Sequence, residues 1–396
     1  MSVKILKILV CGLFFWGLNA HLWGKDNSFL GVAERAYKSG NYSKAASYFK
    51  KACNDGVSEG CTQLGIIYEN GQGTRIDYKK ALEYYQSACQ ADDREGCFGL
   101  GGLYDEGLGT TQNYQEAIDA YAKACVLKHP ESCYNLGIIY DRKIKGNAAQ
   151  AVTYYQKSCN FDMANGCYVL GVAYEKGFLE VKQSNHKAVI YYLKACRLDD
   201  GQACRALGSL FENGDAGLDE DFEVAFDYLQ KACTLNNSGG CASLGSMYML
   251  GRYVKKDPQK AFNFFKQACD MGSAVSCSRM GFMYSQGDAV PKDLRKALDN
   301  YERGCDMGDE VGCFALAGMY YNMKDKENAI MIYDKGCKLG MKQACENLTK
   351  LRGIEKFNQS PKLSSCLTQN FSKIWLCFKK QKAQTPLAFV MNAANL

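Results

Sequence analysis

Paired cysteines are the residues of this 396-residue chain whose type and spacing could support chemistry. Two cysteines eight residues apart occur nine times along the chain: Cys53/Cys61, Cys89/Cys97, Cys125/Cys133, Cys159/Cys167, Cys196/Cys204, Cys233/Cys241, Cys269/Cys277, Cys305/Cys313 and Cys337/Cys345. A repeated dithiol of this kind can bind a metal ion, cycle between thiol and disulfide, or form a structural cross-link. The surrounding sequence favours the cross-link.

The cysteine pairs lack the other ligands that a metal site needs. A structural zinc site usually contains a second ligand pair and Cys-x2-Cys spacing, and no repeat of this chain supplies either. Histidine, the other common zinc ligand, occurs only as His21, His129 and His186. We therefore expect no metal ion, and no other cofactor.

The first twenty residues have the layout of a secretory signal peptide. Lys4 and Lys7 precede an apolar run, Ile8–Leu18, that is followed by Ala20 and is too short to cross a membrane. Removal of residues 1–20 would leave 20 of the 21 cysteines, an even number that is typical of a disulfide framework in an oxidising compartment. We expect a protein secreted to the periplasm or the medium, with no transmembrane segment.

The cysteines could pair in two ways. Each second cysteine could bond backward to the first cysteine of its own pair, or forward to the first cysteine of the next pair. Forward pairing would leave Cys53 and Cys345 without partners, whereas backward pairing leaves neither. The count therefore favours a disulfide within each of the nine pairs.

The spacing between pairs indicates a repeat. From one pair to the next the first cysteine advances by 32 to 37 residues, and self-similarity at this period is the signature of a solenoid. In five of the nine units the second cysteine begins the full pattern Cys-x-x-Leu-Gly-x-x-Tyr, as in Leu64, Gly65 and Tyr68, whose offsets share one helical face, and the glycine recurs in seven units. Glycine costs about 0.5–1 kcal/mol inside a helix, so its recurrence predicts a close approach between helices.

A second helical pattern leads into each first cysteine. Alanine stands eight residues before that cysteine in all nine units, and aromatic residues cluster four or five residues before it, as in Tyr84 and Tyr85. We interpret these aromatic residues as core rather than as a ligand cage. Turn signals such as Asn70-Gly71-Gln72-Gly73 separate the two helices. Each unit is therefore expected to be an αα-hairpin.

These motifs resemble the Sel-one-like repeat, a relative of the tetratricopeptide repeat. With its cysteine pairs and signal peptide, the chain is similar to the Helicobacter cysteine-rich secreted proteins over about residues 28–352. The resemblance implies an all-α, right-handed superhelical solenoid of αα-hairpins stapled by disulfides. It also implies a family description as penicillin-binding proteins or β-lactamases.

The expected domains are a signal peptide (1–20), a solenoid of about nine repeats (21–352) and a basic tail (353–396). Residues 28–38 repeat the Leu-Gly helix without its cysteine, which predicts an N-terminal capping half-repeat. The tail contains Cys366 and Cys377, and we expect a capping helix there in preference to a membrane-binding or partner-binding helix. Of the net charge of +6, the signal carries +2 and residues 354–396 carry +5, so the solenoid is near neutral and nucleic acid is not expected as its partner.

No catalytic residue can be assigned from the sequence. A serine β-lactamase combines Ser-x-x-Lys with Ser/Tyr-x-Asn and Lys-Thr/Ser-Gly elements. Matching letters occur as Ser47-x-x-Lys50, Tyr68-x-Asn70 and Lys38-Ser39-Gly40, but in the wrong order and without a strand to hold the last. Such matches arise by chance in a lysine-rich chain.

Two sets of polar residues are candidates for binding. An acid follows the helix tyrosine or phenylalanine in five successive units: Glu69, Asp105, Asp141, Glu175 and Glu212. These acids would either pair with lysines of the next helix, such as Lys79 or Lys80, or line a groove. Polar residues also stand one or two positions after the second cysteine: Gln63, Asn135, Arg205 and Arg279.

Two functions remain open at this stage. The resemblance implies binding or hydrolysis of β-lactams or peptidoglycan-like amides. The residues themselves favour a non-enzymatic scaffold that binds a peptide, a protein or a cell-wall fragment on the concave face.

Overall fold

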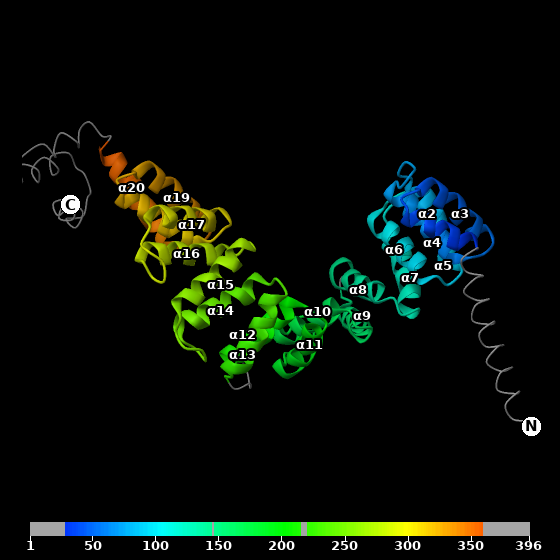
Figure 1. Cartoon of the computed structure of the whole chain (residues 1–396), viewed down its shortest axis with the longest axis horizontal. Coiled ribbons are helices and arrows are strands. Elements are labelled where there is room, and N and C mark those ends of the chain that lie inside the picture. Colours follow the sequence, from blue (N-terminus) through cyan, green and yellow to red (C-terminus); the bar gives the residue numbers. More distant parts are fainter. Residues whose placement is uncertain (1–27, 145, 215–219, 359–396) are drawn as a thin grey trace, which may run out of the picture. The chain divides into compact units, whose positions relative to one another are not determined.

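The computed structural model describes residues 28–144, 146–214 and 220–358, and all regular structure in this part of the chain is helical (Figure 1). It contains 19 α-helices and one π-helix, and no strand among the described residues. The expected all-α repeat fold is confirmed. The predicted signal peptide and the two tail cysteines, Cys366 and Cys377, lie outside the described residues.

The helices alternate between two kinds. Helices that carry the second cysteine in their first turn, here called second-cysteine helices, are α4 (Ser58–Asn70), α6 (Arg94–Glu106), α8 (Pro130–Ile138), α10 (Ala164–Lys176), α12 (Gly201–Asn213), α14 (Ser238–Leu250), α16 (Ala274–Gln286), α18 (Glu310–Asn322) and α20 (Lys342–Asn358). Helices that carry the first cysteine in their last turn, here called first-cysteine helices, are α3 (Tyr42–Asn54), α5 (Tyr78–Gln90), α7 (Tyr114–Val126), α9 (Ala148–Asn160), α11 (Asn185–Arg197), α13 (Phe222–Thr234), α15 (Pro258–Asp270), α17 (Leu294–Asp306) and α19 (Lys326–Lys338). Helix α2 (Phe29–Lys38) precedes them, and α20 continues six residues past Arg352.

Helix ends follow from capping residues in the sequence. Asp77 begins α5 by accepting a hydrogen bond from the backbone N–H of Lys80 at 3.1 Å. Six second-cysteine helices end ten residues after their cysteine at a glycine in the left-handed conformation: Gly71, Gly107, Gly177, Gly214, Gly251 and Gly287. Lys143 stands at this position after α8, and there the chain forms the π-helix η1 (Ile139–Lys143) in place of the glycine cap.

All nine predicted disulfides are present. Each joins the last turn of a first-cysteine helix to the first turn of the following second-cysteine helix, with Cα atoms 4.4 to 4.9 Å apart. The bonded pairs are Cys53–Cys61, Cys89–Cys97, Cys125–Cys133, Cys159–Cys167, Cys196–Cys204, Cys233–Cys241, Cys269–Cys277, Cys305–Cys313 and Cys337–Cys345. Backward pairing is therefore correct, and each bond fixes the helix that ends one hairpin to the helix that begins the next.

Burial agrees with the structural role that the sequence predicted for these cysteines. A sulfur atom that binds a ligand or exchanges with a redox partner must be accessible from solvent. Eight of the bonded cysteines are 0% exposed: Cys97, Cys133, Cys167, Cys204, Cys241, Cys277, Cys305 and Cys313. Seven of them lie in the first turn of a second-cysteine helix, and Cys305 lies in the last turn of α17. They are therefore structural cross-links and form no surface for a ligand.

The recurrent glycine makes room for an aromatic ring of the next helix, whereas the sequence pattern predicted only a close approach between helices. A Cβ atom added to Gly101 in α6 would lie 2.6 Å from Cδ1 of Tyr121 in α7, too close for any side chain. The same contact joins Gly245 to Phe265 and Gly281 to Tyr301. These rings are buried, which confirms that the aromatic residues four positions before the first cysteine belong to the core.

The chain divides into two compact units between Tyr228 and Leu229, inside α13. Within the first unit α4 contacts α6 and α10 contacts α12, and within the second α16 contacts α18. These neighbouring second-cysteine helices thus touch one another directly.

Candidate functional site

The layer of second-cysteine helices presents one helical face to solvent. On α16 the exposed positions are Val275, Arg279, Phe282 and Gln286, at helical spacing, while Cys277, Met280 and Met283 point into the core. The positions two before, two after and five after the second cysteine are called here the open face. Three predicted binding residues, Gln63, Asn135 and Arg279, lie on it, and Arg205 is exposed one position away from it.

These four residues differ in their exposure and in the groups that they contact. Asn135 is half-buried and forms a hydrogen bond with the hydroxyl of Tyr121, whose pKa is raised by burial. Arg279 is exposed, with its guanidinium carbon 5.4 Å from the ring centroid of Phe265. No carboxylate of the described residues forms an ion pair with Arg205 or Arg279. The two arginines are therefore the cations here that remain available to a ligand.

Two of the five predicted acids bind core tyrosines. The hydroxyl of Tyr85 donates a hydrogen bond to Glu69 at 2.5 Å, and the hydroxyl of Tyr192 donates one to Glu175 at 2.6 Å. The lysine expected to pair with Glu69 pairs elsewhere, because Lys80 lies 3.3 Å from Asp77. The hydroxyl of Tyr85 is buried and needs a hydrogen-bond partner within the protein, which Glu69 supplies, whereas Lys80 is solvated.

Asp105 and Asp141 do not share this contact. Burial raises the pKa of Asp105, and the charge of Lys143 opposes that shift. Asp141 lies in η1, 3.9 Å from Arg142, and Glu212 is half-buried near the end of α12. Each acid belongs to a different hairpin, so the five form a periodic row and not a cluster at one site.

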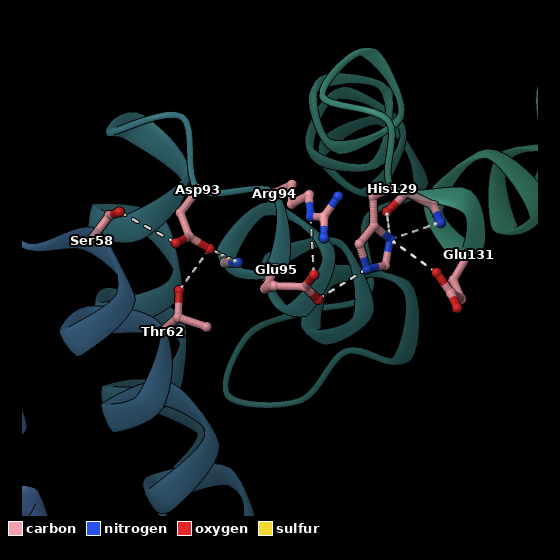
Figure 2. Close-up of polar contacts among 9 residues, drawn as sticks. Ser58, Thr62, Asp93, Arg94, Glu95, His129 and Glu131 are labelled. Carbon is pink, nitrogen blue, oxygen red and sulfur yellow. Dashed lines mark hydrogen bonds and ion pairs between the residues drawn. The ribbon is translucent and has the colours of Figure 1, made fainter. Parts of the chain in front are cut away.

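Sequence reasoning missed a polar junction between consecutive hairpins, four residues before the second cysteine (Figure 2). Asp93 caps α6 through the backbone N–H of Gly96 at 2.8 Å, and it also accepts hydrogen bonds from Thr62 at 3.0 Å and Ser58 at 3.3 Å, both in α4. The signal was present in the sequence as a recurring capping residue at this position. The sequence pattern did not show that the same residue also binds side chains of the preceding hairpin.

His129 occupies the same position in the next hairpin. Its Nδ1 accepts from the backbone N–H of Ser132 at 3.2 Å and caps α8, while its Nε2 lies 3.0 Å from Glu95 (Figure 2). Phe98 packs against the imidazole with ring centroids 4.6 Å apart. Since Nδ1 accepts, Nε2 carries the proton and donates to the carboxylate of Glu95 in the neutral imidazole.

This junction has the atom types of a nucleophile–base–acid triad, but not the geometry. Ser132 Oγ lies 3.0 Å from His129 Nδ1, yet Ser132 is 0% exposed and His129 only 5% exposed. The nitrogen facing the serine is also occupied by a backbone donor. A substrate cannot reach this hydroxyl, so the cluster is a structural cap.

The sequence matches to β-lactamase motifs are also scattered. Ser47 lies in the middle of α3, and Lys38-Ser39-Gly40 lies at the end of α2. Among the described residues there is no group of three side chains that could hold a metal ion. The helices that the structure describes include none that is long and apolar enough to cross a membrane.

A shallow depression of about 420 Å³ lies beside α15 in the second unit. Its lining includes Asn236, Lys266 and Asp270, and the last two form an ion pair at 2.8 Å. With its charges paired within one helix, this depression offers less to a ligand than the open face does.

Comparison with known proteins identifies the repeat. The Sel1 repeat pattern matches residues 29–57, 58–93, 94–127, 130–160, 164–200, 201–237, 238–273 and 274–309, and a tetratricopeptide repeat pattern matches residues 312–339. The boundary between the first two matches lies inside the Cys53–Cys61 loop, so this disulfide crosses from one repeat to the next.

Similar relatives come from Helicobacter pylori. The chain is 98% identical to "Putative beta-lactamase HcpE" of strain 26695 over 354 residues, which cover 89% of this chain and all of the relative. It is also 48% identical to "Putative beta-lactamase HcpD" over 42 residues, 11% of this chain and 14% of that one. Both names describe those proteins.

Solved structures show the same fold. A protective antigen of uropathogenic Escherichia coli aligns with a TM-score of 0.68 at 25% identity, over 85% of this chain and 71% of that one. A Sel1 repeat protein from Oxalobacter formigenes aligns with a TM-score of 0.63 at 22% identity, over 79% of this chain and 92% of that one. The second likeness supports the fold alone.

Proposed function

Since this chain belongs to the Sel1-repeat family and to the cysteine-rich Hcp proteins, we propose that it is a secreted scaffold that binds an extended peptide or protein segment. The binding surface in this proposal is the open face of the second-cysteine helices. Stacked repeats give such a face a length that suits an extended ligand.

The observation that carries the proposal is a contrast in charge pairing between the two layers. On the first-cysteine helices, cations two residues before the cysteine pair with acids of the preceding hairpin: Lys123 with Asp92, Lys194 with Asp162, Arg303 with Asp270 and Lys335 with Asp306. On the second-cysteine helices, Arg205 and Arg279 are exposed and pair with no carboxylate of the described residues. The four cations of the first-cysteine helices contribute to the stack. Arg205 and Arg279 are available to a ligand, unlike Arg94, Lys176 and Arg352 of the same layer, which pair with Glu95, Glu175 and Asp334.

Secretion is supported by the nine disulfides. Cytosolic glutathione and thioredoxin keep most thiols reduced, whereas the periplasm and the extracellular medium are oxidising. A stack in which every junction is cross-linked suits that environment. The predicted leader, residues 1–20, is consistent with the same destination.

A peptide selection tests the scaffold proposal. The purified, oxidised protein is presented to a random displayed-peptide library, and affinities of enriched peptides are measured with the double variant Arg205→Ala/Arg279→Ala. We expect the double variant to bind at least one enriched class about tenfold more weakly, because charge-assisted hydrogen bonds contribute about 1.5–3 kcal/mol. The matched control is Lys194→Ala/Lys335→Ala, which removes two paired cations from the other layer. Failure to enrich any peptide, or equal losses in both variants, contradicts the proposal.

A second candidate function, hydrolysis of β-lactams, rests on the names of the two 98% identical relatives. Ser132, which lies 3.0 Å from a histidine nitrogen, is buried under His129 and supplies no accessible nucleophile. Turnover of a chromogenic cephalosporin by the purified oxidised protein tests it. Activity that rises with protein concentration and disappears after reduction and alkylation supports hydrolysis, and a rate equal to buffer excludes it.

A further inference from the structure

The open faces of the two units differ in chemistry. In the first unit the position two before the second cysteine is glutamate on three successive helices, Glu59, Glu95 and Glu131. In the second unit α14, α16 and α18 carry glycine, valine and valine there. Across all three open-face positions of these three helices, one side chain is charged, that of Arg279.

The second unit exposes apolar side chains around that cation. Val275 is 51% exposed and Phe282 52% exposed, and they flank Arg279 along α16. Val311 on α18 is 53% exposed, and α18 contacts α16 directly. Three apolar side chains that are half in water on one small surface are candidates for burial by a partner.

Small residues beside Phe282 leave space for incoming side chains. At the same position of the neighbouring helices, α14 has Ser246 and α18 has Gly318. A Cβ atom added at Gly318 would have a single neighbour within 4 Å, the hydroxyl oxygen of Tyr333 at 3.8 Å. The ring of Phe282 is therefore larger than the residues at the same position of the two neighbouring helices. An uneven surface of this kind suits the alternating side chains of an extended segment.

The guanidinium of Arg279 is held but not neutralised. It lies 5.4 Å from the ring centroid of Phe265 in α15, which limits its freedom. No described carboxylate pairs with it, although acids pair with cations elsewhere in the same unit, as Asp270 does with Lys266 and Arg303. A cation that is held in place among apolar groups forms a stronger ion pair with a carboxylate of a ligand than a fully solvated cation does.

From these features we infer that the open face of α14, α16 and α18 binds an extended segment of a partner protein in which a single acidic residue lies between apolar residues. The carboxylate of that segment pairs with Arg279, and its apolar side chains cover Val275, Phe282 and Val311. This inference rests on the proposed scaffold function and names the chemistry of its partner at the second unit. The glutamates of the first unit exclude such a segment from the equivalent surface there.

Fluorescence anisotropy with three synthetic peptides tests the inference. The probe is the dye-labelled, amidated peptide Gly-Leu-Phe-Asp-Leu-Val, and the other two carry Asn or Lys in place of Asp. We expect the Asp peptide to bind about tenfold tighter than the Asn peptide, and the Lys peptide to bind weakest. Arg279→Gln should remove the difference between Asp and Asn, and Arg279→Lys should retain part of it. Phe282→Ser should weaken the Asp and Asn peptides by the same factor.

Arg303→Gln is the matched control, because it removes an exposed arginine of the same unit that lies on the first-cysteine helix α17 and pairs with Asp270. It should leave all three affinities unchanged. Equal binding of the Asp and Asn peptides, absence of binding by the Asp peptide, or equal effects of Arg303→Gln and Arg279→Gln would overturn the inference. The library selection described above remains independent, since enriched peptides without this pattern would support a scaffold while refuting this partner.

Discussion

The hydroxyl of Tyr85 donates a 2.5 Å hydrogen bond to Glu69, across the connector between α4 and α5. The ring of Tyr85 fills the space left by Gly65 and Gly99, while its hydroxyl reaches the half-buried carboxylate. Tyr192 and Glu175 repeat the arrangement in another hairpin. Tyr85 thus packs its ring in the apolar contact between helices and uses its hydroxyl for a polar contact within the same repeat.

Replacing Tyr85 by phenylalanine isolates the polar part of this contact. Tyr85→Phe keeps the ring and removes the donor, so the free energy of unfolding should fall by about 1 kcal/mol. Tyr155→Phe is the matched control, because the Tyr155 hydroxyl forms no hydrogen bond with the described residues and its loss should cost less. Chemical denaturation of the oxidised protein measures both. Equal losses in the two variants would show that the bond to Glu69 contributes nothing.

Alkaline pH should unfold the stack. Burial raises the pKa of Tyr85, Tyr121, Tyr155 and Tyr192 in the folded protein above the value of about 10 found in unfolded chains. A raised folded pKa contributes stability that is complete below pH ~10 and is lost as the pH rises above it. Circular dichroism and phenolate absorbance, followed together, should show helix loss and buried-tyrosine ionisation in one transition. Ionisation of these tyrosines in the intact helical protein would contradict the prediction.

Two adjacent glycines of α6 should respond oppositely to alanine. At Gly101 the new Cβ atom meets Tyr121 at 2.6 Å, and such overpacking costs about 1–3 kcal/mol, more than the helix propensity gained. At Gly102 the nearest atom is the Tyr121 hydroxyl oxygen at 3.7 Å, so alanine should stabilise by about 0.5–1 kcal/mol. Thermal unfolding of Gly101→Ala and Gly102→Ala checks the signs. If both variants were more stable than the parent protein, the ring of Tyr121 could not lie against Gly101.

His129 should be replaceable by another capping residue at a limited cost. Asn237 caps α14 by accepting from Gly240 at 2.9 Å, so His129→Asn should keep the cap of α8 and lose the contact with Glu95. His129→Ala should lose both and destabilise by about 0.5–2 kcal/mol. Hydrogen exchange of the amides at the start of α8 reports on the cap. Identical exchange in the two variants would mean that the cap is unimportant.

Removal of one disulfide should weaken the stack according to its position. The chain-entropy treatment assigns about 2.5 kcal/mol to a nine-residue loop. Cys89→Ala/Cys97→Ala lies in the interior and should lower the stability of hairpins on both sides. Cys337→Ala/Cys345→Ala is the control at the last junction, where only α19 and α20 should open earlier. Hydrogen exchange measured hairpin by hairpin distinguishes these patterns from a uniform loss.

The sequence by itself determined the repeat, its two helices and its disulfides, because these depend on neighbours close in the chain. Cys89 and Cys97 are eight residues apart, and Gly101 recurs with the repeat, so periodicity was sufficient to predict the disulfide and a close approach of helices at the glycine. The tertiary structure decided the partners of the polar residues. Glu69 reaches Tyr85 and not Lys80, and Thr62 reaches Asp93 across 31 residues. The Thr62–Asp93 contact depends on how far one hairpin is rotated against the next, and the Glu69–Tyr85 contact on how the two helices of one hairpin pack. Both are set by the packing of whole helices and are absent from any local pattern.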